Sequence, residues 1–119
     1  MSLEVGEKYN GNYSIEEIMD LIDSDIQKAI KRGEIVPFKY HIHKKRLGWT
    51  PEIIVKVLSI SKPFLKYDKG EKTKEFEKFE NKLNEIGKAY NKTDSEIMAD
   101  YYETRYYFDI QYSDKVFPN

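Results

Sequence analysis

The sequence predicts an α+β fold: a small three-stranded antiparallel sheet with two main helices packed on one face, in the order α-β-β-α-α-β. In residues 15–32 and 76–90, apolar side chains recur every three or four positions, as in amphipathic helices. In residues 36–43 and 104–112 they alternate with polar ones, as in strands with one solvent-facing side. Helices on one face of the sheet would bury all of these apolar surfaces together. A chain of 119 residues suits a single domain, and we expect residues 1–12 to be flexible.

The first helix carries its own start and stop signals. Ser14 and Glu17 have the spacing of a capping box, in which each side chain accepts a hydrogen bond from the other residue's backbone amide. Gly33 can adopt the left-handed conformation that ends a helix. We therefore expect residues 15–32 to be helical.

A β-hairpin is predicted to follow. The first strand alternates from Val36 onward, whereas both faces of residues 52–60 are mostly apolar. A strand that is apolar on both faces belongs inside a sheet rather than at its edge. Residues 44–51, with Gly48 among them, would form the connection.

The C-terminal half should contain a connector over residues 61–73, the second helix, a short extra helix and the last strand. Gly87 would weaken the last turn of the second helix modestly. Thr93 and Glu96 repeat the capping-box spacing, which predicts the short extra helix.

Composition excludes several classes of protein. Cysteine is absent, which excludes disulfides, thiol catalysis and cysteine zinc sites and fits a reducing cytoplasm. No run of about 18 apolar residues occurs, so we expect no membrane association. The sequence contains neither a Walker loop nor a dinucleotide fingerprint nor a nucleophile elbow. We therefore expect a protein that is not an enzyme and needs no cofactor.

Two arrangements of polar residues bear on metal or acid–base chemistry. His41 and His43 would leave the same face of a strand and could hold a metal ion, but lysines flank them and would repel a cation, so we expect no metal site. Acid pairs such as Asp20 with Asp23, or Asp94 with Asp100, could act as acid and base, and they also fit capping or solvation roles.

The hairpin carries the most informative surface pattern, in which basic residues lead to the only tryptophan. Cations beside an aromatic ring suit a phosphate backbone with stacked bases, and tryptophan with arginine equally suits a protein–protein hot spot. A third interpretation has the tryptophan folded over the core and the lysines serving solubility. The candidate partner-binding residues here are Lys39, His41, Lys44, Lys45, Arg46 and Trp49.

The last strand supplies a second candidate surface. Arg105 and Tyr107 should face outward with Asp109 and Gln111, and such a mixed polar and aromatic strip is typical of a binding surface. We therefore include Arg105 and Tyr107 among the candidate partner-binding residues.

Residues 93–102 read TDSEIMADYY and precede the aromatic pair Tyr106 and Tyr107 at the start of the last strand. This tail, together with the capped helix and hairpin before it, resembles large polyvalent protein-associated domain 29. The resemblance implies a protein of a phage or conjugative element, acting in the host cytoplasm, and it brings no catalytic residues.

Together these observations predict a non-catalytic counter-defence inhibitor, of the anti-CRISPR type, that binds a host protein such as a defence nuclease. The alternative is a nucleic-acid-binding accessory domain that uses the basic hairpin. A third class, an enzyme, would require a polar cleft with convergent acids or a bound metal.

Overall fold

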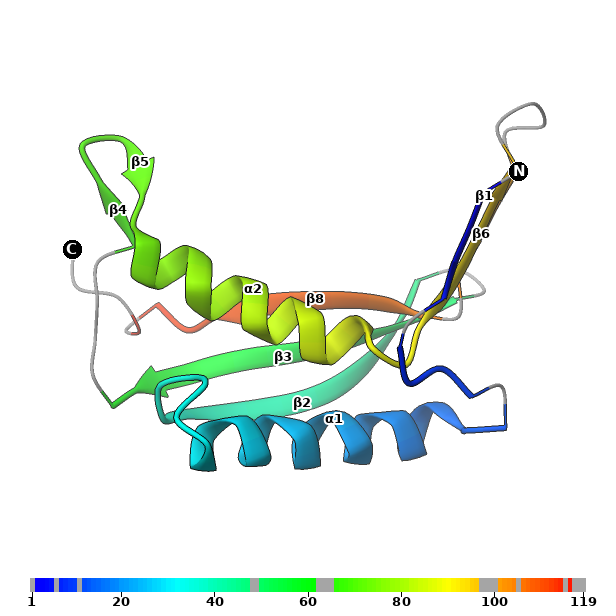
Figure 1. Ribbon diagram of the computed structural model, residues 1–119, viewed down its shortest axis with the longest axis horizontal. Helices are drawn as coiled ribbons and strands as arrows, with labels where there is room; N and C mark the ends of the chain where they lie inside the picture. The colour runs from blue at the N-terminus through cyan, green and yellow to red at the C-terminus, as the bar shows by residue number, and fades with distance from the viewer. Residues whose placement is uncertain are drawn as a thin grey trace.

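The computed structural model describes residues 2–5, 7–10, 12–47, 50–61, 66–96, 101–104, 106–114 and 116. Its elements in chain order are β1 (Ser2–Val5), α1 (Ile15–Lys31), β2 (Phe38–Leu47), β3 (Thr50–Ile60), β4 (Tyr67–Asp68), β5 (Glu71–Lys72), α2 (Lys74–Lys88), β6 (Lys92–Glu96), β7 (Tyr101–Thr104) and β8 (Tyr107–Tyr112). Figure 1 shows α1 and α2 lying along a long sheet, with the β4–β5 hairpin projecting at one end and strands β1 and β6 side by side at the other.

The main sheet has the strand order β2-β3-β8, so β3 is the central strand, as its two apolar faces predict. The β2–β3 pair is antiparallel, which confirms the predicted hairpin, but β8 pairs with β3 in parallel. The prediction of a purely antiparallel sheet is therefore wrong. The reason is that α2 lies between β3 and β8 and carries the chain back to the end of the sheet where β3 began, so the next strand runs in the same direction.

The predicted element order is also wrong after α2. Where the capping-box spacing predicted a short helix, Lys92–Glu96 forms strand β6, which pairs with β7 on one side and with β1 on the other. Thr93 and Glu96 follow the local rule for a helix start, but ladder bonds to distant segments hold their backbone extended instead. The first residues of the chain thus contribute a strand to a second sheet.

The predicted connector over residues 61–73 contains the small β4–β5 hairpin. Its turn residues, Lys69 and Gly70, have φ angles of 52° and 83°. Positive φ at both central positions is the requirement of a type I′ turn, whose twist matches that of the paired strands.

Helix α1 forms as predicted. Ser14 accepts a hydrogen bond from the Glu17 amide, Glu17 accepts one from the Ser14 amide, and both contacts of the capping box are present. Gly33 follows the helix with a φ of 72°. The apolar stripe of α1 buries Ile18, Ile22, Ile26 and Ala29.

Helix α2 begins after Thr73, whose side chain accepts from the Phe76 amide. Gly87 lies in its last turn, where the sequence predicted only a modest weakening. A Cβ atom placed there would lie 2.2 Å from the ring of Phe108 on β8. The glycine is therefore a packing requirement, because it lets the helix approach the strand closely.

Both helices pack on the same face of the main sheet, as predicted. Ile53, Val55 and Val57 of β3 point into a core shared with α1 and α2, and all three are fully buried. Tyr106, which precedes β8, and Val116 complete this core near the C-terminal end of the chain.

Four tyrosine hydroxyls tie the helices to neighbouring segments. Tyr40 of β2 donates to Asp23 of α1, and Tyr112 of β8 donates to Glu80 of α2 at 2.8 Å. Tyr90 donates to Asp25 of α1 at 2.5 Å. Tyr106 donates to the carbonyl oxygen of Gly87 at 2.6 Å.

Burial raises the pKa of all four hydroxyls, and for the three that donate to carboxylates the hydrogen bond raises it further.

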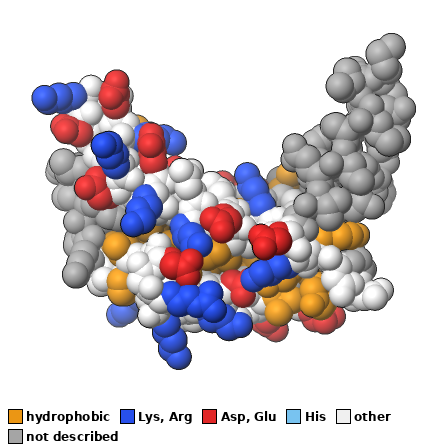
Figure 2. Space-filling view, in the orientation of Figure 1, with side chains coloured by type: hydrophobic (Ala, Val, Ile, Leu, Met, Phe, Trp, Pro, Cys, Tyr) orange, Lys and Arg blue, Asp and Glu red, His pale blue; other side chains and the backbone are white. Residues whose placement is uncertain are grey.

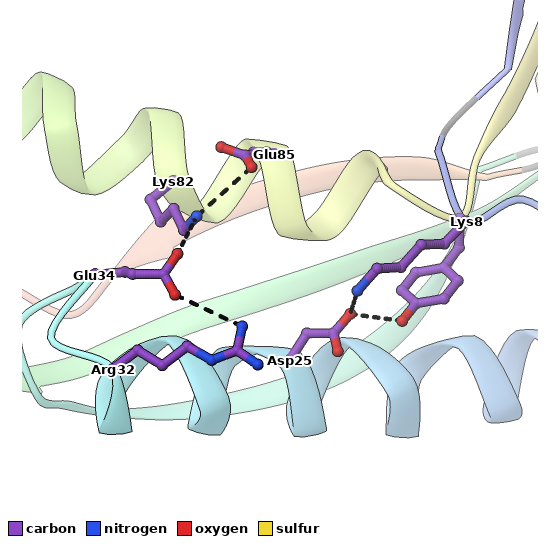
Figure 3. Close-up of polar contacts among 7 residues, drawn as sticks. Lys8, Asp25, Arg32, Glu34, Lys82 and Glu85 are labelled. Atoms are coloured by element: carbon purple, nitrogen blue, oxygen red, sulfur yellow. Dashed lines mark hydrogen bonds and ion pairs between the residues drawn. The ribbon is translucent and has the colours of Figure 1, made fainter.

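Two groups of ion pairs add to these contacts (Figure 3). Lys8 lies 3.0 Å from Asp25, which also accepts from Tyr90. Glu34 lies 2.8 Å from Lys82 of α2, which holds the segment after α1 against the second helix. Lys82 lowers the pKa of Glu34, and Glu34 in turn raises that of Lys82. Water and salt screen such surface pairs, so the apolar core remains the main source of stability.

Replacing Gly87 by alanine should lower the free energy of unfolding by about 1–3 kcal/mol, because the added methyl group overpacks against Phe108. Helix propensity alone predicts the opposite sign, a gain of about 1 kcal/mol. Urea unfolding of Gly87→Ala measures the difference, and the double variant Gly87→Ala with Phe108→Leu should recover part of the loss. A stabilised Gly87→Ala protein would show that the helix and strand can move apart freely.

Stability should fall as the pH rises above about 10, the ordinary pKa of tyrosine. The unfolded chain then loses phenolic protons that the folded chain retains at these four hydroxyls, so the free energy of unfolding decreases. Phenolate absorbance and circular dichroism recorded against pH should show that ionisation of the four buried hydroxyls coincides with loss of the fold. Replacing Tyr112 by phenylalanine should reduce the absorbance change of that phase. Ionisation of these four hydroxyls in a chain that is still folded is the contrary result.

Candidate functional site

The side of the main sheet opposite the helices carries a compact grid of nine side chains, which we call the open face. The strand registers place them in three rows across β2, β3 and β8. The rows are Lys45, Glu52 and Tyr107; His43, Ile54 and Asp109; and His41, Lys56 and Gln111. Five of the nine are exposed, which marks this side as the solvent-facing side of the sheet.

Ile54 occupies the centre of the open face and is only 1% exposed. It does not belong to the core beneath the helices, so it is buried separately on the other side of the sheet. Leu58, four residues further along the same strand, is 44% exposed and lies at the edge of this surface. The open face is therefore a polar surface over a buried apolar residue, with an exposed leucine at its edge.

Charges of both signs surround Ile54. Lys45 and Lys56 are exposed, as is Asp109, and Glu52 lies between Lys45 and Tyr107 in its row. The helix side likewise mixes basic and acidic side chains, as Figure 2 shows for the side with α2 in front. The open face therefore combines charge balance with a buried apolar residue.

His41 and His43 leave the same side of β2, as their spacing predicts. Their rings stack with centroids 5.5 Å apart. The Nδ1 atom of His43 is buried and makes no hydrogen bond to the described residues. Among those residues, no group of three His, Cys, Asp or Glu side chains gathers as a metal site would require.

The structure divides the basic residues that the sequence grouped together. Lys39, His41 and Lys45 face the open side of the sheet, whereas Lys44 and Arg46 alternate to the helix side. Lys44 lies 2.5 Å from Glu16 of α1 and lowers the pKa of that carboxyl. The sequence treated residues 44–51 as a connection, but β2 continues to Leu47 and β3 begins at Thr50. Successive side chains therefore continue to point to opposite faces of the sheet through residues 44–46, and Lys45 lies on the opposite face from Lys44 and Arg46.

The last strand has the predicted orientation. Tyr107 lies on the open face with Asp109 and Gln111, and the residues that alternate with them pack on the core. Trp49 and Arg105 lie outside the described residues, as do Gly48 and Asp100. The candidates that the structure brings onto one surface are Lys39, His41, Lys45 and Tyr107.

The acid pair Asp20 and Asp23 lies on the exposed flank of α1, and Asp23 accepts the hydrogen bond from Tyr40. The hydroxyl of Tyr40 also accepts from Gln27 at 2.7 Å. These contacts give Asp23 a structural role in holding α1 against β2.

Sequence reasoning missed the central role of Ile54 and the participation of Lys56. The signal was present in the apolar character of both faces of residues 52–60, which placed β3 inside the sheet. What the sequence lacked was the parallel register that sets Ile54 beside Asp109.

Comparison with family models, curated proteins and solved structures finds no match to this chain. Within the described residues, neither helix has the length and apolar character needed to cross a bilayer.

Replacing Ile54 by alanine should lower the free energy of unfolding by about 2–4 kcal/mol, since the side chain is buried although it lies on the solvent side of the sheet. Leu58→Ala is the matched control on the same strand and should cost less than about 1 kcal/mol. Chemical denaturation of both variants tests this difference. Equal small losses would mean that Ile54 is not shielded from water in solution.

Proposed function

We propose that this chain is a non-catalytic binding protein that contacts a protein partner through the open face of its main sheet. The observation that carries the proposal is the set of exposed side chains of both charges on this face, with the exposed Leu58 at its edge. A partner protein can cover Leu58 and pair with the charges of both signs beside it.

Mixed charge favours a protein partner over a nucleic acid. Lys45 and Lys56 could approach phosphates, but the carboxylates of Glu52 and Asp109 lie within the same grid and would repel them. The net charge of −1 provides no general attraction to nucleic acid either.

The second candidate function is binding of single-stranded nucleic acid. It draws support from the shared orientation of Lys39, His41, His43 and Lys45 along β2, with Tyr107 as an aromatic platform at the far strand. Under this alternative, affinity would fall steeply with salt because each neutralised phosphate releases counterions.

The resemblance to large polyvalent protein-associated domain 29 provides the biological setting of the proposal. On that basis we propose a phage or mobile-element protein in the host cytoplasm that inhibits a defence nuclease by binding to it.

Reversing two open-face charges should abolish capture of the partner while the fold persists. The test is affinity capture from a bacterial lysate, with and without nuclease treatment, using the variant Lys45→Glu with Lys56→Glu. The matched control is Lys74→Glu with Lys78→Glu on α2, because these lysines are also exposed and the net change in charge is the same.

We expect the wild-type and control proteins to retain a protein that the open-face variant loses, whether or not nuclease is present. Equal capture by both variants would exclude the open face as the binding surface. Recovery that disappears with nuclease treatment would favour the nucleic-acid alternative.

A further inference from the structure

Strand β2 forms one edge of the main sheet. Within the described residues, it pairs with β3 on one side and has no strand partner on the other. A strand of ten residues with one unpaired edge presents a row of backbone donors and acceptors that another extended segment can join.

Helix α1 runs beside this edge and forms the wall of a groove of about 650 Å³. The α1 wall contains Met19, Asp20, Asp23 and Gln27, and the β2 side is formed by residues 38–42. The groove is open to solvent rather than an enclosed cavity, and several of the side chains that line it are exposed.

The two walls of the groove differ in charge. Asp20 and Asp23 are exposed on the α1 wall, and one oxygen of Asp23 accepts the Tyr40 hydroxyl. At the end of the same flank, Glu16 is paired with Lys44. Lys39 and His41 are exposed on the face of β2 opposite the helices, and they also line the groove. A strand added to β2 would direct alternate side chains toward these two walls, because successive residues of a strand point to opposite faces.

We propose that the groove binds an extended segment of the protein partner that pairs with the edge of β2 and alternates basic and acidic residues. The basic residues face Asp20 and Asp23, and the acidic residues face Lys39 and His41. The inference rests on the proposed function, since it specifies how part of that partner is held.

Charge disfavours a second copy of this chain as the occupant. An antiparallel β2–β2 pair would bring the row Lys39, His41, His43 and Lys45 of one copy against the same row of the other. Like charges opposite one another on adjacent strands are destabilising.

The test uses two blocked peptides of identical composition, one alternating as (Lys-Glu)4 and one arranged as (Lys-Lys-Glu-Glu)2. In an extended conformation only the first sorts its charges onto separate faces. Backbone amide NMR of the full chain, titrated with each peptide, reports both the affinity and the site. The variant Asp20→Lys and its control Glu77→Lys, on the exposed side of α2, change the net charge equally.

We expect the alternating peptide to shift the amide signals of residues 38–44 and 19–27 and to bind at least tenfold more tightly than the rearranged peptide. Asp20→Lys should weaken this binding at least tenfold, while Glu77→Lys should leave it unchanged. Sedimentation of the free chain should show a monomer. Absence of binding, equal binding of the two peptides, shifts confined to another surface or a β2-mediated dimer would overturn the inference.

These outcomes are separate from the test of the proposed function. The capture experiment changes Lys45 and Lys56, which do not line the groove. A partner that is lost on reversing those lysines but retained by Asp20→Lys would leave the proposed function standing and overturn the groove assignment.

Discussion

The arrangement of this molecule depends on burial of β3 on both of its faces. Ile53, Val55 and Val57 pack beneath the helices, and Ile54 is buried on the opposite side. A strand fixed on both faces cannot slip in register, because a shift by one residue would exchange the two sets of side chains. The registers of β2 and β8 follow from β3, and with them the composition of the open face.

The helices are held to this sheet by directional contacts as well as by apolar packing. The hydroxyls of Tyr40 and Tyr112 reach from the two outer strands to carboxylates on α1 and α2. Such bonds fix the helix positions along the sheet, which a purely apolar interface would leave less defined. Because these contacts hold the strands in place, the open face loses little conformational entropy when it binds a partner, and this favours affinity.

Features with a local cause could be predicted from the sequence. The capping box at Ser14, the apolar stripes of both helices and the alternation after Tyr106 each depend on residues close together in the chain. The parallel pairing of β8 and the strand character of residues 92–96 could not be predicted, because both depend on partners far away in the sequence. Gly87 illustrates the limit, since its importance comes from Phe108.

The side chains of the candidate surface could be predicted only strand by strand. Alternate residues of a strand point to the same face, so the sequence placed Lys39 and His41 on one face of their strand and Tyr107 on the outer face of its own. The separation of Lys45 from Lys44 and Arg46 required knowing that β2 extends to Leu47. That these residues form one surface could be seen only from the order and register of the strands in the sheet.

The position of β8 in the chain also governs how the protein is made. Its partner β3 lies in the first half of the sequence, so closing the parallel pair requires a large loop and should follow formation of the local hairpin. During synthesis, the edge of β3 that β8 will occupy stays unpaired until β8 emerges. A chain cut before Tyr107 would lack one column of the open face and would expose a long apolar strand edge, so loss of binding and a tendency to aggregate should arise together.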